Sequence, residues 1–220
     1  MARSNRIGFI SMGSKVCEKL YNFEWFMGLS LAQRQRSIRS LHDEIRKSGV
    51  EKVLEISSKS EDELGRRLSA FNLMVEVNGV KTCVESIYHS SKVFYGGIKY
   101  NECVGMNPKE CRKFISDEVE NKKLLLKEFE FNGMKFDLNT KSLCYDYIYI
   151  LGLTQNENLA KEILNYDCFT DIVFSQTKGI GCQARTCALY KYLRNNNLVE
   201  KFIKNPYKFG FMYKNMYRYN

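Results

Sequence analysis

Two Asn-Gly pairs constrain the fold more than any other feature of this chain. Asn78-Gly79 lies between the alternating runs of "LMVEVNGVKTCV", and Asn132-Gly133 lies in the same way within "KEFEFNGMKFDL". Asn and Gly accept the positive φ angles of a type I′ turn, whose twist matches that of two antiparallel strands. Each pair therefore predicts a β-hairpin.

Most of the remaining periodicity is helical. Apolar residues recur at helical spacing over three long segments, residues 30–47, 145–165 and 182–196. A short helix should begin near Ser60, which forms a capping-box pattern with Glu63, and should end near Leu68. "EKVLEISSKS" just before it predicts a strand that leads into a polar loop. We expect an α+β fold, a helix-rich single domain with two small β-hairpins.

The length of 220 residues suits one domain. We expect a basic N-terminal extension over residues 1–20, the domain over 21–200, and a basic aromatic C-terminal tail over 201–220. No run of about 18 apolar residues predicts a membrane span, and the N-terminus lacks a secretory signal. These features favour a cytoplasmic protein that does not bind membranes.

The eight cysteines include no C-x-x-C pair, and there are only two histidines. This pattern argues against a zinc site and against a disulfide framework. Free cysteines are commonly small core residues. We therefore expect no metal and no cofactor.

The chain has a net charge of +9, which favours polyanionic partners such as nucleic acid. Residues 201–220 carry five basic side chains and no acidic one, together with aromatic residues that suit base stacking. The alternative is that Phe202, Phe209 and Phe211 pack on the core while the lysines keep the chain end soluble.

The segment "VESIYHSSKVF" predicts a helix with a charged stripe. The helix is expected to include Phe94 and Tyr95, so Glu85 and Lys92 lie at nearly the same angle and about 10 Å apart along its axis, with His89 between them. This arrangement suits a small cleft. It equally suits a solvated helix edge, where Glu85 and His89 pair and the two end charges complement the helix dipole.

Several segments resemble the NADAR superfamily, whose members are named for NAD and ADP-ribose. "LSAFNL", "VEVNGVKT" and "VESIYHSSKVF" are similar to the superfamily's "SNF"-like element, its hairpin and its "V-E-H-Y-Y-Q-A-x-K" helix. "FEWFMGLSLAQRQRSIRSLHDE", "VLEISSKSEDELGRRLSAFNLMV", "YDYIYILGL" and "FTDIVFSQTKGIGCQARTCAL" resemble the NADAR antitoxins that accompany DarT-type toxins. The resemblance covers residues 20–196. It implies the NADAR fold.

The resemblance also implies an activity, which is removal of ADP-ribose from ADP-ribosylated guanine in DNA, with RNA as the other possible substrate. Lys92 and Glu85 are then the catalytic residues. Lys92 attacks the sugar as a neutral amine and forms a Schiff base, or else it stabilises charge while Glu85 activates water. Burial of the ammonium group would favour the neutral amine. Where the superfamily has His-Tyr-Tyr/Phe-Gln, this chain has Ser86-Ile87-Tyr88-His89, so contacts at these positions do not transfer.

The resemblance extends to candidate substrate contacts. These are Ser58 and Lys59 before a helix start, Ser69, Phe71 and Asn72 in the "SNF"-like element, Tyr88 and His89 on the helix, and Asp171, Gln183 and Arg185 near the C-terminal end. The loop at Ser58 suits a pyrophosphate, Asp171 a ribose, and Arg185 a phosphate. Asp171 and Arg185 could equally form a structural pair.

Two other functions fit the same residues. A basic module could neutralise a DarT-type toxin, or shield nucleic acid, without catalysis. A small-molecule N-glycosidase could act on nucleotide or riboflavin intermediates, although it would have little use for a charge of +9. Salt sensitivity of turnover separates the N-glycosidase from a hydrolase that acts on nucleic acid. The non-catalytic module predicts protection that survives loss of Lys92 and Glu85 but falls when residues 201–220 are removed.

Overall fold

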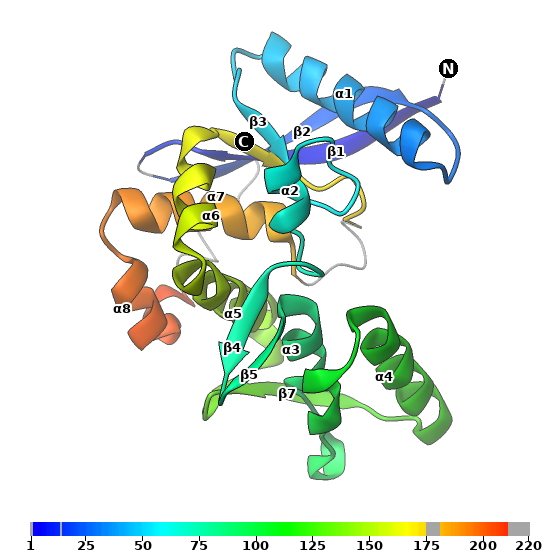
Figure 1. Ribbon diagram of the computed structural model, residues 1–220, viewed down its shortest axis with the longest axis vertical. Helices are drawn as coiled ribbons and strands as arrows, with labels where there is room; N and C mark the ends of the chain where they lie inside the picture. Colours follow the sequence, from blue (N-terminus) through cyan, green and yellow to red (C-terminus); the bar gives the residue numbers. More distant parts are fainter. Residues whose placement is uncertain (1, 14, 175–180, 211–220) are drawn as a thin grey trace.

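The computed structural model describes residues 2–13, 15–174 and 181–210, and it has the α+β fold expected from the sequence (Figure 1). The strands are β1 (Ala2–Ser11), β2 (Val16–Trp25), β3 (Val53–Glu55), β4 (Met74–Val77), β5 (Val80–Cys83), β6 (Lys92–Phe94), β7 (Leu126–Phe131), β8 (Met134–Phe136) and β9 (Cys168–Thr170). The helices are α1 (Leu31–Lys47), α2 (Glu63–Arg67), α3 (Val84–Ser90), α4 (Pro108–Lys122), α5 (Lys141–Gln155), α6 (Glu157–Glu162), α7 (Gln183–Asn195) and α8 (Val199–Lys204). Short 3₁₀ helices span Tyr95–Gly97, Asn101–Gly105, Leu138–Thr140, Ile163–Asn165 and Pro206–Phe209.

Both Asn-Gly hairpins are confirmed. Strands β4 and β5 pair in antiparallel register around Asn78-Gly79, and β7 and β8 pair around Asn132-Gly133. The Asn residues have φ angles of 51° and 48°, and the glycines have φ angles of 78° and 71°. These left-handed conformations are the ones that a type I′ turn requires.

The N-terminal segment lies inside the fold, where the sequence had predicted an extension. Strand β1 pairs with β2 along its whole length and with β9 at Phe9 and Ile10, which gives a sheet with the order β2-β1-β9-β3. The segment is held there because Ile7 and Phe9 alternate along β1 and are buried in the main core. Its basic residues lie at exposed or half-buried positions of the same strand.

The four-stranded sheet is covered by helices on both faces. Helix α1 buries Ile38, Leu41 and Ile45 against one face, in a cluster with Phe23 of β2. Gly8 of β1 faces this helix, since a Cβ atom there would lie 2.9 Å from the Tyr21 ring and 3.4 Å from Ile45. Helix α7 contacts β1 and β9. The sheet is therefore sandwiched between α1 and α7.

The helix ends follow local chemistry. Ser30 caps α1 by accepting a hydrogen bond from the Gln33 amide, as expected. Helix α2 is instead capped by Asp62, which accepts from the Leu64 amide, so the predicted start at Ser60 was wrong. The expected helix over 145–165 is divided at Asn156, whose side chain donates to the carbonyl of Gly152.

Helix α5 lies at the centre of the main core. Every residue from Leu143 to Ile150 is buried, including the polar Asp146. A helix that is apolar on nearly all sides can only be stable inside the protein. Helix α3, the β6-β7-β8 sheet and α4 are grouped on one side of α5, and α1 with its sheet lies on the other (Figure 1).

The predicted C-terminal tail is helical where the structure describes it. Phe202 and Phe209 are buried in the main core, so the core-packing alternative applies to these two residues. Phe211 and the rest of residues 211–220 lie outside the described part. Within the described ranges, no helix is long and apolar enough to cross a membrane.

Candidate active site

Helix α3 is shorter than the sequence predicted. It ends at Ser90, and Lys92 begins strand β6, opposite Phe129 of β7. The Ser90 and Ser91 hydroxyls donate to the carbonyls of Ile87 and Tyr88, which satisfies carbonyl groups at the helix end. The expected two-turn separation of Glu85 and Lys92 on one helix was therefore wrong. Lys92 instead folds back next to the last turn.

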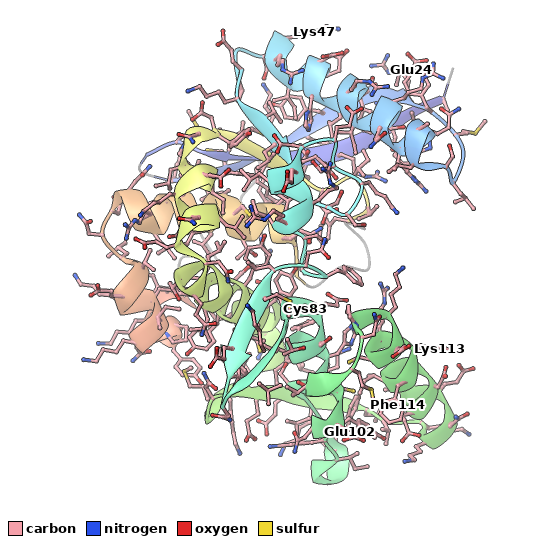
Figure 2. The ribbon with its side chains drawn as sticks, in the orientation of Figure 1. Glu24, Lys47, Cys83, Glu102, Lys113 and Phe114 are labelled. Atoms are coloured by element: carbon pink, nitrogen blue, oxygen red, sulfur yellow. The ribbon has the colours of Figure 1, made fainter. Side chains whose placement is uncertain are left out.

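A cavity of about 360 Å³ opens at this helix. Its walls come from α3, α4, α5, α7, the segment before β4 and the segment after β9. Seven of the predicted site residues line it: Phe71, Glu85, Tyr88, His89, Lys92, Asp171 and Gln183. In Figure 2, Cys83 marks the start of α3 and Lys113 marks α4, two elements that line the cavity, and both lie in the half of the molecule away from α1. The volume is typical of a small-ligand pocket.

Glu85, His89 and Lys92 form a continuous hydrogen-bonded relay. The His89 Nε2 atom lies 3.1 Å from Glu85 Oε1, and His89 Nδ1 lies 2.9 Å from Lys92 Nζ. A carboxylate oxygen accepts, so Nε2 carries the imidazole proton and Nδ1 accepts from Lys92. The imidazole therefore presents its basic nitrogen to the lysine, and the carboxylate is placed to stabilise an imidazolium. This is the arrangement by which triads activate a nucleophile.

Burial sets the protonation of this relay. Burial lowers the pKa of Lys92, an effect opposed by the charge of Glu85 and assisted by Arg112. Burial also lowers the pKa of His89, although its hydrogen bond to Glu85 raises it. Removing water destabilises both cations, so the neutral amine and the neutral imidazole are favoured relative to exposed residues.

Tyr88 also lines this cavity, and its buried hydroxyl is unpaired among the described residues. Its ring stacks on Phe129 at a centroid distance of 5.2 Å, and Lys92 Nζ lies 5.9 Å from its ring centre. The side chain is 8% exposed, and its Oη atom has no hydrogen-bond partner within the described residues. A buried hydroxyl without a partner costs free energy, which a ligand atom could recover.

A second polar group, formed by Asp171 and Gln183, also lines the cavity. The Asp171 carboxylate accepts from the Val173 and Phe174 amides and from Gln183 Nε2 at 3.0 Å. Gln183 Oε1 in turn accepts from the Ala70 amide at 2.8 Å. Burial, followed by the charge of Glu55, raises the pKa of Asp171 to about 8.

The "SNF"-like segment forms the wall that joins these two groups. The Ala70 carbonyl accepts from the Glu85 amide at the start of α3, while its amide donates to Gln183. Phe71 is thereby held at the cavity. Ser69 is buried next to it, and Asn72 is exposed and donates to the Arg66 carbonyl.

Five predicted contacts lie outside the residues that line the cavity. Ser58 is exposed and Lys59 is half-buried, both in the loop after β3. Ser69 and Asn72 belong to the wall but do not face the cavity. Arg185 lies 3.5 Å from Asp146 of α5, whereas the Asp171 carboxylate accepts a hydrogen bond from Gln183.

Sequence reasoning missed several lining residues. Arg112 of α4 brings an exposed cation to the cavity, and Tyr145 and Phe174 add aromatic walls. The helical pattern of "PKECRKFISDEVENK", with Pro108 at its first turn, was the available signal for α4. Tyr145 lies in the quoted "YDYIYILGL" segment, but no local pattern indicates that it faces a ligand.

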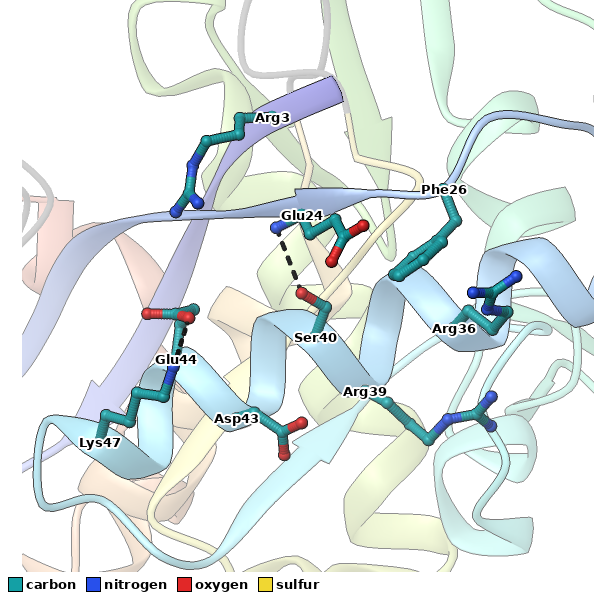
Figure 3. Close-up of a pocket in the computed structure, with 9 residues that line it drawn as sticks. All are labelled: Arg3, Glu24, Phe26, Arg36, Arg39, Ser40, Asp43, Glu44 and Lys47. Carbon is teal, nitrogen blue, oxygen red and sulfur yellow. Dashed lines mark hydrogen bonds and ion pairs between the residues drawn. The ribbon is translucent and has the colours of Figure 1, made fainter. Parts of the chain in front are cut away.

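Another cavity, of about 410 Å³, lies between α1 and strands β1 and β2 (Figure 3). Its lining mixes cations such as Arg36 with carboxylates such as Glu44, which is paired with Lys47. Its charged groups are largely exposed and several are already paired, so we regard it as a solvated groove. Across the residues that the structure describes, no cluster of His, Cys, Asp and Glu could hold a metal ion.

Comparison with known families decides the identity. The sequence model of one protein family, described as the DarT1-associated NADAR antitoxins, matches residues 4–220 of this chain. The chain belongs to this family. The match includes β1 and the C-terminal segment, which the resemblance over residues 20–196 had left out. No curated protein matches the chain. Membership assigns an antitoxin role and implies a DarT-type toxin as its counterpart.

Proposed function

We propose that this NADAR antitoxin is a hydrolase that removes ADP-ribose from ADP-ribosylated guanine in DNA. The observation that carries the proposal is the Glu85–His89–Lys92 relay within a cavity of about 360 Å³. Catalysis by an amine needs a lysine that is neutral near pH 7, and burial lowers the pKa of Lys92 in that direction. The family's antitoxin role supports the choice of a toxin's product as substrate.

The first step opens the ribose. A general acid protonates the ring oxygen, the bond between this oxygen and the anomeric carbon breaks, and the guanine nitrogen is left as an imine of that carbon. Glu85 is the natural source of the proton: it enters this step as the carboxylic acid, gives its proton to the ring oxygen, and leaves as the carboxylate of the relay. Asp171, which also lines the cavity, accepts hydrogen bonds from the ribose hydroxyls.

The second step exchanges the guanine for the enzyme. Lys92 Nζ adds to the anomeric carbon, and a proton must leave Nζ and reach the guanine nitrogen before the carbon–guanine bond breaks. His89 Nδ1, which lies 2.9 Å from Nζ, takes this proton, and the resulting imidazolium is stabilised by Glu85. Unmodified guanine then leaves. Water adds to the Lys92 imine, the carbon–nitrogen bond breaks, and the ADP-ribose aldehyde closes to its ring form.

The test is release of free ADP-ribose, followed by mass, from a guanine-ADP-ribosylated oligonucleotide. We expect release by the unaltered protein and none above background by Lys92→Ala or Glu85→Ala. Lys161→Ala is the matched control, because Lys161 is exposed on α6, where it pairs with Glu157, and does not line the cavity. Absence of release by the unaltered protein would overturn the proposal. Protection of cells that survives Lys92→Ala would favour a non-catalytic antitoxin.

A further inference from the structure

Strands β1 and β2 and the first half of α1 carry a set of arginines stacked on aromatic rings, beside the cavity that contains Lys92. The guanidinium groups of Arg6 and Arg34 lie 5.2 and 4.9 Å from the ring centre of Trp25. The guanidinium of Arg36 lies 4.1 Å from the ring centre of Phe26, and Figure 3 shows the two side by side. We call these five residues the arginine–aromatic surface.

The ion pairs of α1 involve cations that lie outside this surface. Further along α1, Arg39 pairs with Glu61, Arg46 with Asp43, and Lys47 with Glu44. By contrast, no acidic partner of Arg34 or Arg36 is found among the described residues. Stacking on a ring holds a guanidinium in place while its N–H edge remains available, so less entropy is lost when it binds an anion.

The surface is joined to the candidate active site. Arg6 Nε donates to the Ile172 carbonyl at 3.2 Å, and the next two residues, Val173 and Phe174, line the cavity. Arg6 is also close enough to Asp171 and to Arg34 for their charges to affect its pKa, which burial lowers. A polymeric ligand that extends out of the cavity past Val173 therefore contacts Arg6 and Trp25 first.

We propose that the arginine–aromatic surface binds the single-stranded DNA that flanks the modified guanine. Arg34 and Arg36 contact its phosphates, and the rings and guanidinium planes offer stacking platforms for its bases, the two features that single-stranded nucleic-acid sites combine. The charge of +9 supports a polyanion as the occupant. This inference rests on the proposed function, because it identifies the substrate as a strand and not as a free nucleotide.

The first test is binding of an unmodified, fluorescently labelled single-stranded oligonucleotide, measured by anisotropy over a range of salt concentrations. We expect Arg34→Ala/Arg36→Ala to bind about tenfold more weakly at low salt, with a salt slope smaller by about 1.4, since two phosphate contacts are lost. Arg46→Ala/Lys47→Ala is the matched control, because it removes two paired charges from the same helix. Equal losses in both variants would overturn the inference.

Trp25 gives a direct readout of position, because it is the only tryptophan in the chain. Saturating DNA should quench its emission in the unaltered protein, since stacked or adjacent bases quench indole fluorescence. Unchanged emission with DNA fully bound would place the strand elsewhere and refute the inference.

Kinetics separate this inference from the proposed function. The ratio of kcat/KM for the modified oligonucleotide to that for ADP-ribosylated guanosine should fall about tenfold in Arg34→Ala/Arg36→Ala. Hydrolysis with an unchanged ratio would refute the surface and leave the proposed function standing. Binding that depends on Arg34 and Arg36, with neither substrate hydrolysed, would support the surface and refute the proposed function.

Discussion

Replacement of His89 by asparagine tests the relay most sharply. The Asn side chain can keep an acceptor near Lys92 Nζ, which lies 2.9 Å from the imidazole nitrogen, but it cannot take up the proton. A positioned general acid–base contributes about 10²- to 10⁴-fold. We expect single-turnover release at pH 7.5 to fall by about 10²- to 10³-fold, or about 3–4 kcal/mol of barrier.

The pH profile distinguishes proton transfer from a structural role. In the unaltered protein the rate should rise with pH and level off once Lys92, whose pKa burial lowers, has lost its proton. In His89→Asn the rate should continue to rise, because hydroxide replaces the imidazole. His89→Gln, which can keep a hydrogen bond to Glu85, should behave in the same way. A defect of less than threefold, or a constant defect at every pH, would refute the relay.

Three further substitutions test the surrounding groups. Lys92→Arg keeps the charge but cannot lose a proton, so ADP-ribose release should fall to background; near-normal release would favour attack by water. Tyr88→Phe removes a hydroxyl that has no hydrogen-bond partner among the described residues, so the melting temperature should not fall, whereas the Kd for ADP-ribose measured by calorimetry should rise about 5- to 10-fold. The pKa of Asp171 is about 8 in the folded protein and about 4 in the unfolded chain. Between about pH 4 and pH 8 the folded protein therefore binds one proton more than the unfolded chain. The free energy of unfolding should therefore fall by about 1.4 kcal/mol per pH unit between these values relative to Asp171→Asn, as measured by urea titration; a constant difference would contradict the assignment.

Local chemistry made part of the fold predictable. The two Asn-Gly hairpins and the Ser30 cap depend on residues close together in the sequence, and both form as predicted. The four-stranded sheet depends on residues far apart, since Phe9 of β1 pairs with Phe169 of β9. No turn signal marks such a pairing, so the sequence placed β1 outside the domain.

The candidate active site was likewise predictable only where residues close together in the sequence determine it. Spacing and family resemblance together indicated Glu85, His89 and Lys92, and the structure brings them into one relay. The helical spacing itself was misleading, because serine hydroxyls end α3 before Lys92 is reached. Arg112 could not be assigned from its own neighbourhood, because its position at the cavity depends on how α4 packs against α3.

The central claim is that the Lys92 amine forms a covalent bond with the sugar. The direct measurement is peptide mass mapping after the protein has been incubated with guanine-ADP-ribosylated DNA in the presence of borohydride, which reduces an imine to a stable amine. The account predicts one ADP-ribosyl adduct, located on Lys92 and absent from the Lys92→Arg protein. Release of ADP-ribose under these conditions with Lys92 unmodified would contradict it.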